Sequence, residues 1–306
     1  MEIVRQLAKK VSNWGRWGDD DERGTLNFVS AEVVRRGAAC VRRGEVFSLG
    51  LSFGAEGPQI GQGGRVNPLH LMSAINGAIP GYPGDFRFAD DVIIMGLQCA
   101  TQWDSLAHVH YDGRLYNGFP IETTTASGAS RNGIDKIGNG VVSRGVLLDL
   151  ARTRGVERLA PGTAVSPADL EAAEKAEGIR VERGDVLLVR TGHLGAYKVD
   201  GDRVAYMRMM PGLGLACAEW LHAREVAAVA TDTNAVEVIP FEDPKLPLPF
   251  HMVAIRDMGL LLGEMFDLDE LAADCARDGV WEFLFSAPPL KVTGGIGSPL
   301  NPLGVK

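Results

Sequence analysis

Short apolar segments that alternate with amphipathic ones constrain the fold of this chain most strongly. Runs rich in Val, Ile and Leu, bounded by Gly, Asp or Pro, predict strands at residues 46–53, 91–97, 145–150, 185–190, 225–230 and 281–285. Further segments predict helices at residues 30–41, 166–176, 213–223 and 268–276. The helix at 166–176 has the clearest start signal, since Ser166 can serve as its N-cap and Pro167 takes its first position. Because strands and helices alternate from about residue 141, we expect a mixed α/β architecture.

The chain has no evident linker, so we expect one domain over residues 1–306 with an N-terminal arm of about residues 1–44. Gly- and Pro-rich stretches at residues 54–68, 76–84 and 238–250 predict long loops. Loops of this length in a compact domain usually cover a site or contact another subunit.

Composition excludes several classes of protein. The chain carries 39 acidic against 31 basic residues, a net charge of −8, which argues against binding to nucleic acid or to an anionic membrane surface. No apolar run is long enough for a membrane span, and the N-terminus lacks the pattern of a signal peptide. Four widely spaced cysteines form no close pair, which favours buried free thiols in a reducing compartment. We therefore expect a cytoplasmic protein whose partner is a small molecule.

The segment MGLQCATQWDSLAHVHYDGRLYNG, residues 95–118, holds the densest set of polar groups. Thr101 is placed to cap a short helix with Asp104 at its third position. Asp104 and His108 would then project from one helical face, because they are four residues apart. A carboxylate and an imidazole so arranged suit metal ligation or acid–base catalysis. The structural alternative is that Asp104 only caps the helix and His108 is a core histidine.

A second segment, residues 249–276, places His251 and Glu264 on either side of a strongly apolar run. A buried, unpaired carboxylate at Glu264 would cost several kcal/mol, so a metal, an arginine or a proton must compensate it. Arg256 or a backbone group is the alternative partner to a metal. Taken with Asp104 and His108, the two segments offer two carboxylates and two imidazoles, a plausible set for a divalent metal ion.

Other residues are weaker candidates. Trp17, His70 and Trp103 are candidates for contact with an apolar or aromatic substrate, although Trp17 can equally anchor the N-terminal arm by burial. Asp232 and Glu237 follow a buried strand and are placed to orient a neighbouring loop. The chain contains no G-x-S-x-G serine motif and no Walker loop, and its GGIG stretch has no following helix, as a dinucleotide loop requires.

These residues resemble the signature of the cyclase family of metal-dependent hydrolases, which contains bacterial kynurenine formamidase and isatin hydrolase. The family signature His-x-Gly-Thr-His-x-Asp, with a further His after it, corresponds to residues 98–104 and His108. A later His and Glu of the family correspond to His251 and Glu264. The stretches NWGRWGDDDERGTLN, TQWDSLAHVHYDGRLYNG and DTNAVEVIP resemble a longer branch of the family, and the resemblance covers nearly the whole chain.

The resemblance implies a swivelling β/α/β fold with a central barrel-like mixed sheet and flanking helices, assembled as a homodimer or homotetramer. It implies that Asp104, His251 and Glu264 hold the metal and that His108 transfers the proton. Gln98 and Gln102 stand where the family has two metal-binding histidines. Because an amide is a weaker zinc ligand than imidazole, we expect one divalent ion, Zn or Mn, with the glutamines as substituted ligands or substrate contacts.

The implied reaction is hydrolysis of an amide, lactam, lactone or ester bond in a small, cyclic or aromatic substrate. Two alternatives remain open. One is a metal-free enzyme in which Gln98 and Gln102 donate hydrogen bonds to an oxyanion beside His108. The other is a catalytically silent protein that binds a small molecule in the same pocket.

Overall fold

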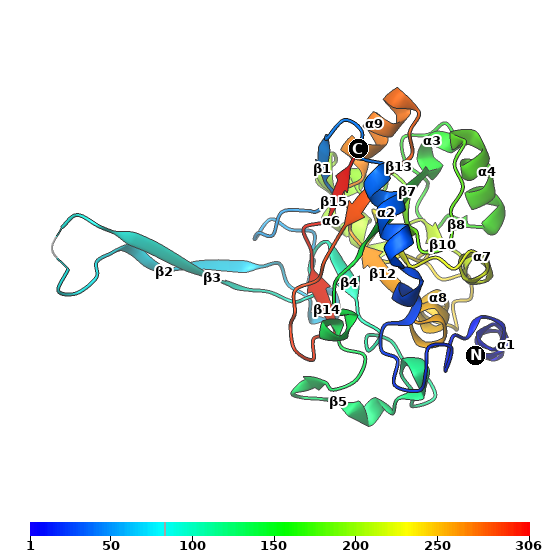
Figure 1. Ribbon diagram of the computed structural model, residues 1–306, viewed down its shortest axis with the longest axis horizontal. Helices are drawn as coiled ribbons and strands as arrows, with labels where there is room; N and C mark the ends of the chain where they lie inside the picture. Colours follow the sequence, from blue (N-terminus) through cyan, green and yellow to red (C-terminus); the bar gives the residue numbers. More distant parts are fainter. Residues whose placement is uncertain (83) are drawn as a thin grey trace.

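A computed structural model describes residues 1–82 and 84–306 of the chain. A nine-stranded mixed sheet curls through the body into a half-barrel (Figure 1). Its strands, in spatial order, are β1 (Val46–Ser48), β15 (Leu303–Val305), β13 (Glu282–Ser286), β7 (Val142–Asp149), β9 (Val186–Arg190), β11 (Ala228–Thr231), β12 (Leu261–Glu264), β4 (Gln102–Asp104) and β14 (Gly297–Pro299). The neighbours β7, β9, β11 and β12 run parallel, and the outer pairs run antiparallel.

Helices flank this sheet, and small two-stranded ladders lie at its periphery. The α-helices are α1 (Glu2–Val11), α2 (Ala31–Ala39), α3 (Leu150–Thr153), α4 (Pro167–Glu177), α5 (Gly195–Lys198), α6 (Arg203–Arg208), α7 (Cys217–Ala223), α8 (Pro249–His251) and α9 (Asp269–Asp278), and the π-helix η6 spans Met252–Met258. Single 3₁₀ turns are η1 (Gly24–Phe28), η2 (Gln62–Gly64), η3 (Tyr116–Gly118), η4 (Ile121–Thr123) and η5 (Ile134–Ile137). The ladders pair β2 (Leu69–Gly77) with β3 (Phe88–Ile94), β5 (Thr124–Thr125) with β6 (Gly128–Ala129), and β8 (Ala164–Val165) with β10 (Gly212–Leu213).

The parallel strands form the centre of the hydrophobic core. Residues of β9, β11 and β12 are buried along almost their whole length, as expected for strands covered on both faces. The expected α/β architecture is confirmed, and the α4 start signal is present as a capping box. In that box the Asp169 amide donates to Ser166 Oγ at 3.3 Å, and the Ser166 amide donates to Asp169 Oδ2 at 2.8 Å.

The prediction of a short helix that begins at Thr101 is wrong. Residues 102–104 form β4, which pairs with β12 on one side and β14 on the other. The Thr101 hydroxyl accepts a hydrogen bond from the Leu51 amide at 2.8 Å and donates to the Met265 carbonyl at 2.6 Å, so it is not free to cap a helix. Tertiary pairing has outweighed a local capping pattern here.

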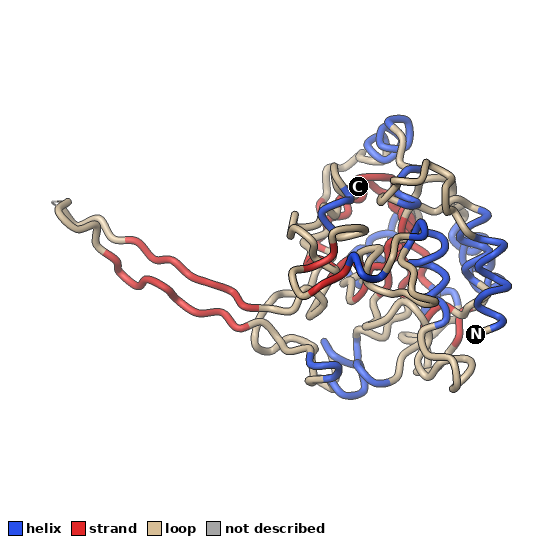
Figure 2. Tube along the Cα trace, turned by 90° about the horizontal axis from the view of Figure 1, so that it is seen from below, coloured by secondary structure: helices blue, strands red, loops and turns tan. Residues whose placement is uncertain are grey.

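The apolar run at 91–97 does not join the central sheet. Residues 88–94 form β3, which pairs with β2 in a hairpin that projects far from the body (Figures 1 and 2). The strand expected at 46–53 shortens to the three residues of β1 at one edge of the sheet. The loop expected at 76–84 overlaps the end of β2 at residues 76–77, and residue 83 of that loop lies outside the described residues.

The N-terminal residues 1–44 pack against the body. Helix α1 lies against η6 and α7, and α2 lies against β7 and β13. Trp14 Nε1 donates to the Arg256 carbonyl at 2.7 Å, which fixes the chain between the two helices. Across residues 1–82 and 84–306, no helix combines the length and the apolar character that crossing a membrane requires.

The Thr101 hydroxyl should be important for stability, because its hydrogen bonds join three segments that are far apart in the sequence. Replacing it as Thr101→Val removes a buried donor and acceptor and should lower the free energy of unfolding by about 1–3 kcal/mol. The matched variant Thr101→Ser keeps the hydroxyl and should stay close to the wild type. Urea denaturation measures both, and equal stability of the two variants would contradict this role.

Candidate metal centre

The two carboxylates of the site come from adjacent strands of the sheet. Asp104 ends β4 and Glu264 ends β12, and the two strands pair antiparallel with Glu264 opposite Gln102. Gly263, the residue before Glu264, permits this close pairing, because a Cβ there would lie 2.5 Å from the Trp103 ring. Gln102 and Asp104 are two residues apart on β4 and share a face, and Glu264 lies on the same face because it is the partner of Gln102. Strand pairing therefore places both carboxylates on one face of the sheet, as diagonal neighbours.

His251 completes a cluster with these carboxylates. It lies at the end of α8, a short helix that Pro249 begins. One ligand atom from each of Asp104, His251 and Glu264 lies within 4.8 Å of the others, and all three residues are buried. His251 Nε2 is 3.3 Å from Glu264 Oε1. Residues that stand about 150 positions apart in the sequence thus meet at one point.

The chemistry of this cluster fits a single divalent cation. Asp104 Oδ2 is buried and has no hydrogen-bond partner among the residues that the structure describes. Such an atom is costly unless a positive charge or a donor reaches it. Two carboxylates and one imidazole are a donor set that Zn and Mn both accept.

Glu237 holds His251 from the side away from the cluster. Its Oε2 lies 2.5 Å from His251 Nδ1 and also accepts the His251 backbone amide at 2.8 Å. With Nδ1 engaged, Nε2 is the nitrogen that faces Asp104 and Glu264, as in carboxylate–histidine–metal arrangements. The sequence predicts only that Glu237 orients a neighbouring loop. Its contact with His251 was not predicted, although its position after a buried strand was the available signal.

Asp232, the other acidic residue after β11, does position a loop. Its carboxylate accepts hydrogen bonds from Thr191 N at 2.9 Å, Thr191 Oγ1 at 2.7 Å and Gly192 N at 2.7 Å. These bonds fix the turn that follows β9. Asp232 therefore acts on backbone next to the site and is not part of the cluster itself.

Burial shifts the protonation equilibria of the cluster. Burial opposes the charged imidazolium of His251, but the hydrogen bond and charge of Glu237, together with Glu264, outweigh it and raise the pKa of His251. Burial and the negative charge of Asp104 raise the pKa of Glu264. Without another cation the cluster retains protons, and a divalent ion would displace them on binding.

His108 lies beside the cluster at its open side. Its Nε2 is 3.8 Å from Asp104 Oδ1, and the side chain is 22% exposed. A turn, in which the His108 amide donates to the Ser105 carbonyl at 3.0 Å, produces this proximity instead of the expected helix. The charge of Asp104 favours the imidazolium, but burial and the positive charges of His251 and Arg65 outweigh it and lower the pKa of His108. The neutral form is a proton acceptor.

The two glutamines have different environments. Gln102 Nε2 donates to Asp104 Oδ1 at 3.2 Å and to Glu264 Oε2 at 2.9 Å, so its amide bridges the two carboxylates. Its Oε1 is buried without a hydrogen-bond partner among the described residues. Gln98 is only partly buried, and its amide lies near Gly297, where a Cβ would come within 2.6 Å of Nε2. Gln102 thus belongs to the cluster, whereas Gln98 lies beside it.

A cavity of about 300 Å³ opens onto the cluster. Its lining residues are Gln59, Gln62, Gly63, Arg65, His108, Met207, Asn234, Ala235, Ile239, Leu248, His251 and Glu264. The volume lies at the lower end of the range for small-molecule sites. The cluster is therefore accessible to a small substrate.

The candidate substrate contacts lie elsewhere. Trp103 is fully buried, packs against Phe266 and Phe285, and donates from Nε1 to the Ala287 carbonyl at 2.9 Å. Trp17 packs edge-on against Phe28, with ring centroids 5.0 Å apart. His70 lies on β2. None of these three candidates lines the cavity.

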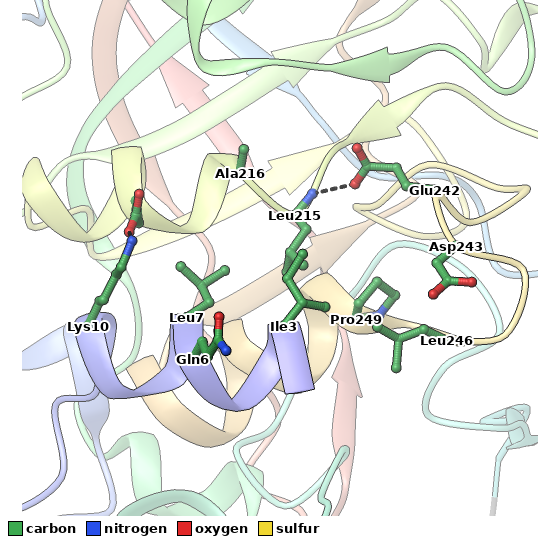
Figure 3. Close-up of a pocket in the computed structure, with 11 residues that line it drawn as sticks. Ile3, Gln6, Leu7, Lys10, Leu215, Ala216, Glu242, Asp243, Leu246 and Pro249 are labelled. Carbon is green, nitrogen blue, oxygen red and sulfur yellow. Dashed lines mark hydrogen bonds and ion pairs between the residues drawn. The ribbon is translucent and has the colours of Figure 1, made fainter. Parts of the chain in front are cut away.

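A larger apolar concavity of about 490 Å³ lies between α1, the start of α7 and the loop at 242–249 (Figure 3). Ile3, Leu7, Leu215 and Leu246 are among its lining residues. Glu242 accepts the Leu215 amide at 2.7 Å at its edge. None of the candidate metal ligands lines it.

Comparisons with known proteins identify the family and the fold of this chain. The Cyclase family model matches residues 48–238. A crystal structure described as a novel cyclase is 38% identical to this chain, with the match covering 98% of this chain and 99% of the other at a TM-score of 0.89. Isatin hydrolase A from Ralstonia solanacearum is 21% identical, with 90% and 95% covered at a TM-score of 0.63. A potential metal-dependent hydrolase with cyclase activity is 16% identical, with 85% and 96% covered at a TM-score of 0.53.

The chain belongs to the cyclase family, since the family model spans more than half of its 306 residues. The two more distant structures share its fold. No curated protein is significantly similar to it in sequence.

Glu237 should control metal affinity without touching the metal. Replacing it as Glu237→Gln keeps a hydrogen-bonding side chain but removes the charge that orients and polarises His251, so metal affinity should fall about 10- to 100-fold. Titration against a chelating indicator measures the effect. The control is Glu242→Gln, which changes the same residue type at the edge of the separate apolar concavity. Equal affinities in the two variants would show that Glu237 has no such role.

Proposed function

We propose that this protein is a hydrolase that uses one divalent metal ion to cleave an amide, lactam, lactone or ester bond in a small substrate. The observation that carries the proposal is the convergence of Asp104, His251 and Glu264 on a cavity that His108 also lines. Hydrolysis of such bonds needs a polarised carbonyl, an activated water and a proton carrier. The cluster and His108 supply groups suited to these tasks.

Each residue has a distinct role in this proposal. Asp104, Glu264 and His251 Nε2 would hold the ion, and Glu237 orients the imidazole. A divalent ion held there would supply Lewis acidity to polarise the substrate carbonyl and lower the pKa of water. His108, held neutral by its surroundings, accepts a proton from the attacking water and returns it to the leaving group.

The donor set bears on the identity of the ion. Gln102 replaces an imidazole with an amide that lies between the two carboxylates. The resulting site is richer in oxygen than one with several histidines, and oxygen donors favour harder ions such as Mn. We therefore infer a single ion per chain, Mn or Zn, with Mn competing better than it would in a histidine-rich site.

Arg65 gives the cavity a preference for anionic substrates. Its guanidinium makes no ion pair or hydrogen bond with the rest of the described chain, although the side chain is partly buried and lines the cavity. The loop before it contains Gly61, Gly63 and Gly64 at positive φ, a conformation that glycine adopts without strain. The geometry of this loop thus presents a cation that a substrate carboxylate can pair with.

Metal removal tests the reaction. Chelation should abolish hydrolysis of a panel of small amides, lactams, lactones and esters, and Mn or Zn should restore it. Retained activity in metal-free protein would instead favour the metal-free enzyme, and no activity in any loaded form would favour a silent binding protein.

His108→Asn should lower turnover about 100-fold or more with metal content unchanged. The control is His110→Asn, an exposed residue two positions on. Unchanged turnover in His108→Asn would remove the proposed base.

Substrate charge is tested at Arg65. Arg65→Gln should raise KM about 10- to 100-fold for a substrate that bears a carboxylate, because a charge-assisted hydrogen bond is lost. The uncharged analogue of the same substrate should be little affected, and kcat should change less than KM. Arg35→Gln, on the exposed surface of α2, is the matched control. Equal losses for charged and uncharged substrates would contradict a role in recognising the carboxylate.

A further inference from the structure

The apolar concavity between α1, the start of α7 and the loop at 242–249, termed the side pocket from here on, has the size of a small-molecule site (Figure 3). Its volume of about 490 Å³ exceeds the 300 Å³ of the cavity at the metal cluster. Three segments that are distant in the sequence form its walls, and each contributes aliphatic side chains. These are Ile3 and Leu7 of α1, Leu215 and Ala216 before α7, and Leu246 and Pro249 of the loop. The side pocket can therefore remove the apolar body of a ligand from water.

The charged residues of the side pocket are mostly acidic. Glu219, Glu242 and Asp243 line it together with one basic residue, Lys10. Lys10 is already paired, because its Nζ lies 2.6 Å from Glu219 Oε1. Lys245 of the same loop does not line the side pocket. The lining thus carries an excess of negative charge next to its aliphatic walls.

Backbone amides hold the two remaining carboxylates in place. Glu242 Oε2 accepts the Leu215 amide at 2.7 Å, and Asp243 Oδ1 accepts the Lys245 amide at 2.9 Å. Within residues 1–82 and 84–306, these amides are their only hydrogen-bond partners, and neither carboxylate forms an ion pair. Glu242 Oε1 and Asp243 Oδ2 are therefore fixed acceptors with capacity for a positively charged donor.

We propose that the side pocket binds an organic ammonium ion, with its apolar body against the aliphatic walls and its charged group at Glu242 and Asp243. An ammonium group has three donors and no acceptor, so it complements carboxylate oxygens that lack a partner. Hydrogen bonds in which both groups are charged are stronger than those between neutral groups. Burial of the apolar body adds a favourable contribution that grows with the buried area.

Other classes of ligand use only part of this surface. A bare metal ion would leave the aliphatic walls exposed to water. A neutral apolar molecule would leave the two carboxylates without a counter-charge, and an anionic ligand would be repelled by them. A cation with an apolar body is the class of ligand that satisfies both the walls and the charges.

The side pocket shares a segment of chain with the cavity at the metal cluster. Leu246 and Pro249 line the side pocket, whereas Leu248 between them lines the cavity. Pro249 begins α8, and His251 ends it. A ligand that packs against Leu246 and Pro249 restricts the segment that carries His251, so less ordering remains to be done when a metal ion binds. This link rests on the proposed metal site, and it predicts that the two ligands raise each other's affinity.

Binding is tested with hexylammonium, and hexanol and hexanoate serve as its neutral and anionic analogues. Calorimetric titration of the metal-free protein should give saturable binding of hexylammonium with a Kd of about 1 mM, as expected for a ligand of few heavy atoms. Hexanol should bind at least about 10-fold more weakly, because one charged hydrogen bond is lost, and hexanoate should not bind. Equal affinity for the three probes, or no binding of hexylammonium, overturns the proposal.

The double variant Glu242→Gln, Asp243→Asn removes both charges and keeps side-chain oxygens that can accept the Leu215 and Lys245 amides. It should bind hexylammonium at least about 10-fold more weakly and hexanol as the wild type does. The matched control, Glu171→Gln with Asp19→Asn, removes the same charge from exposed positions outside the side pocket. Equal weakening in the two double variants overturns the role of Glu242 and Asp243.

A space-filling variant tests the location and the link to the metal cluster. Ala216→Phe places a ring in the side pocket from an exposed position, so the protein should unfold at a temperature close to that of the wild type but no longer bind hexylammonium. Saturating hexylammonium should raise the affinity for Mn about 5-fold or more in the wild type and leave it unchanged in Ala216→Phe. Undiminished binding in Ala216→Phe overturns the location, and an unchanged Mn affinity in the wild type overturns the link. Binding of hexylammonium to metal-free protein requires neither metal nor turnover, so its failure is distinguishable from a failure of the proposed hydrolase activity.

Discussion

The site depends on the concentration of negative charge in a buried place. Asp104, Glu237 and Glu264 surround a single imidazole, and each of these carboxylates is at most 3% exposed. Like charges at this spacing in a poorly polarisable medium repel strongly, and only protons or a cation relieve them. Burial and the charge of Asp104 raise the pKa of Glu264, and the hydrogen bond and charge of Glu237, with Glu264, raise the pKa of His251 against the effect of burial. The protein has thus assembled an arrangement whose electrostatics favour a positive ion at its centre.

The fold supplies the rigidity that such an arrangement needs. The carboxylates lie at the ends of paired strands, where hydrogen bonds on both sides of β4 leave little freedom. Behind Glu264 the backbone turns through Met265 at a φ of 58°, and its carbonyl accepts the Thr101 hydroxyl while its amide donates to the Thr233 carbonyl at 2.8 Å. The candidate metal ligands Asp104 and Glu264 therefore sit on regular strands, whereas Arg65, the proposed substrate contact, sits on a loop. This division is common in enzymes, because chemistry needs fixed geometry and specificity needs surfaces that can vary.

The sequence could predict the architecture and the identity of the clustered residues because both leave periodic or chemical marks. Apolar strands alternate with capped helices, and an acidic residue within an apolar run, such as Glu264, needs compensation wherever it folds. Local patterns failed where long-range contacts decide the outcome, as at Thr101, whose hydroxyl bonds to distant backbone. Trp103 illustrates the same limit, since an indole next to site residues can face the core on the other side of its strand. The projecting hairpin of β2 and β3 was not predicted, because an apolar run in the sequence looks alike whether it enters the core or stays at the surface.

The order of the sheet also bears on how the chain folds during synthesis. Strand β1 pairs with β15, so this edge of the sheet cannot form until residues 303–305 have been synthesised. The hairpin of β2 and β3 leaves the ribosome long before this, with exposed apolar side chains and open strand edges that can recruit other nascent chains. Asp90 and Asp91 next to its apolar residues act as charged gatekeepers during that interval. Production of this protein should therefore be limited by the interval between the synthesis of the β2–β3 hairpin and the synthesis of β15.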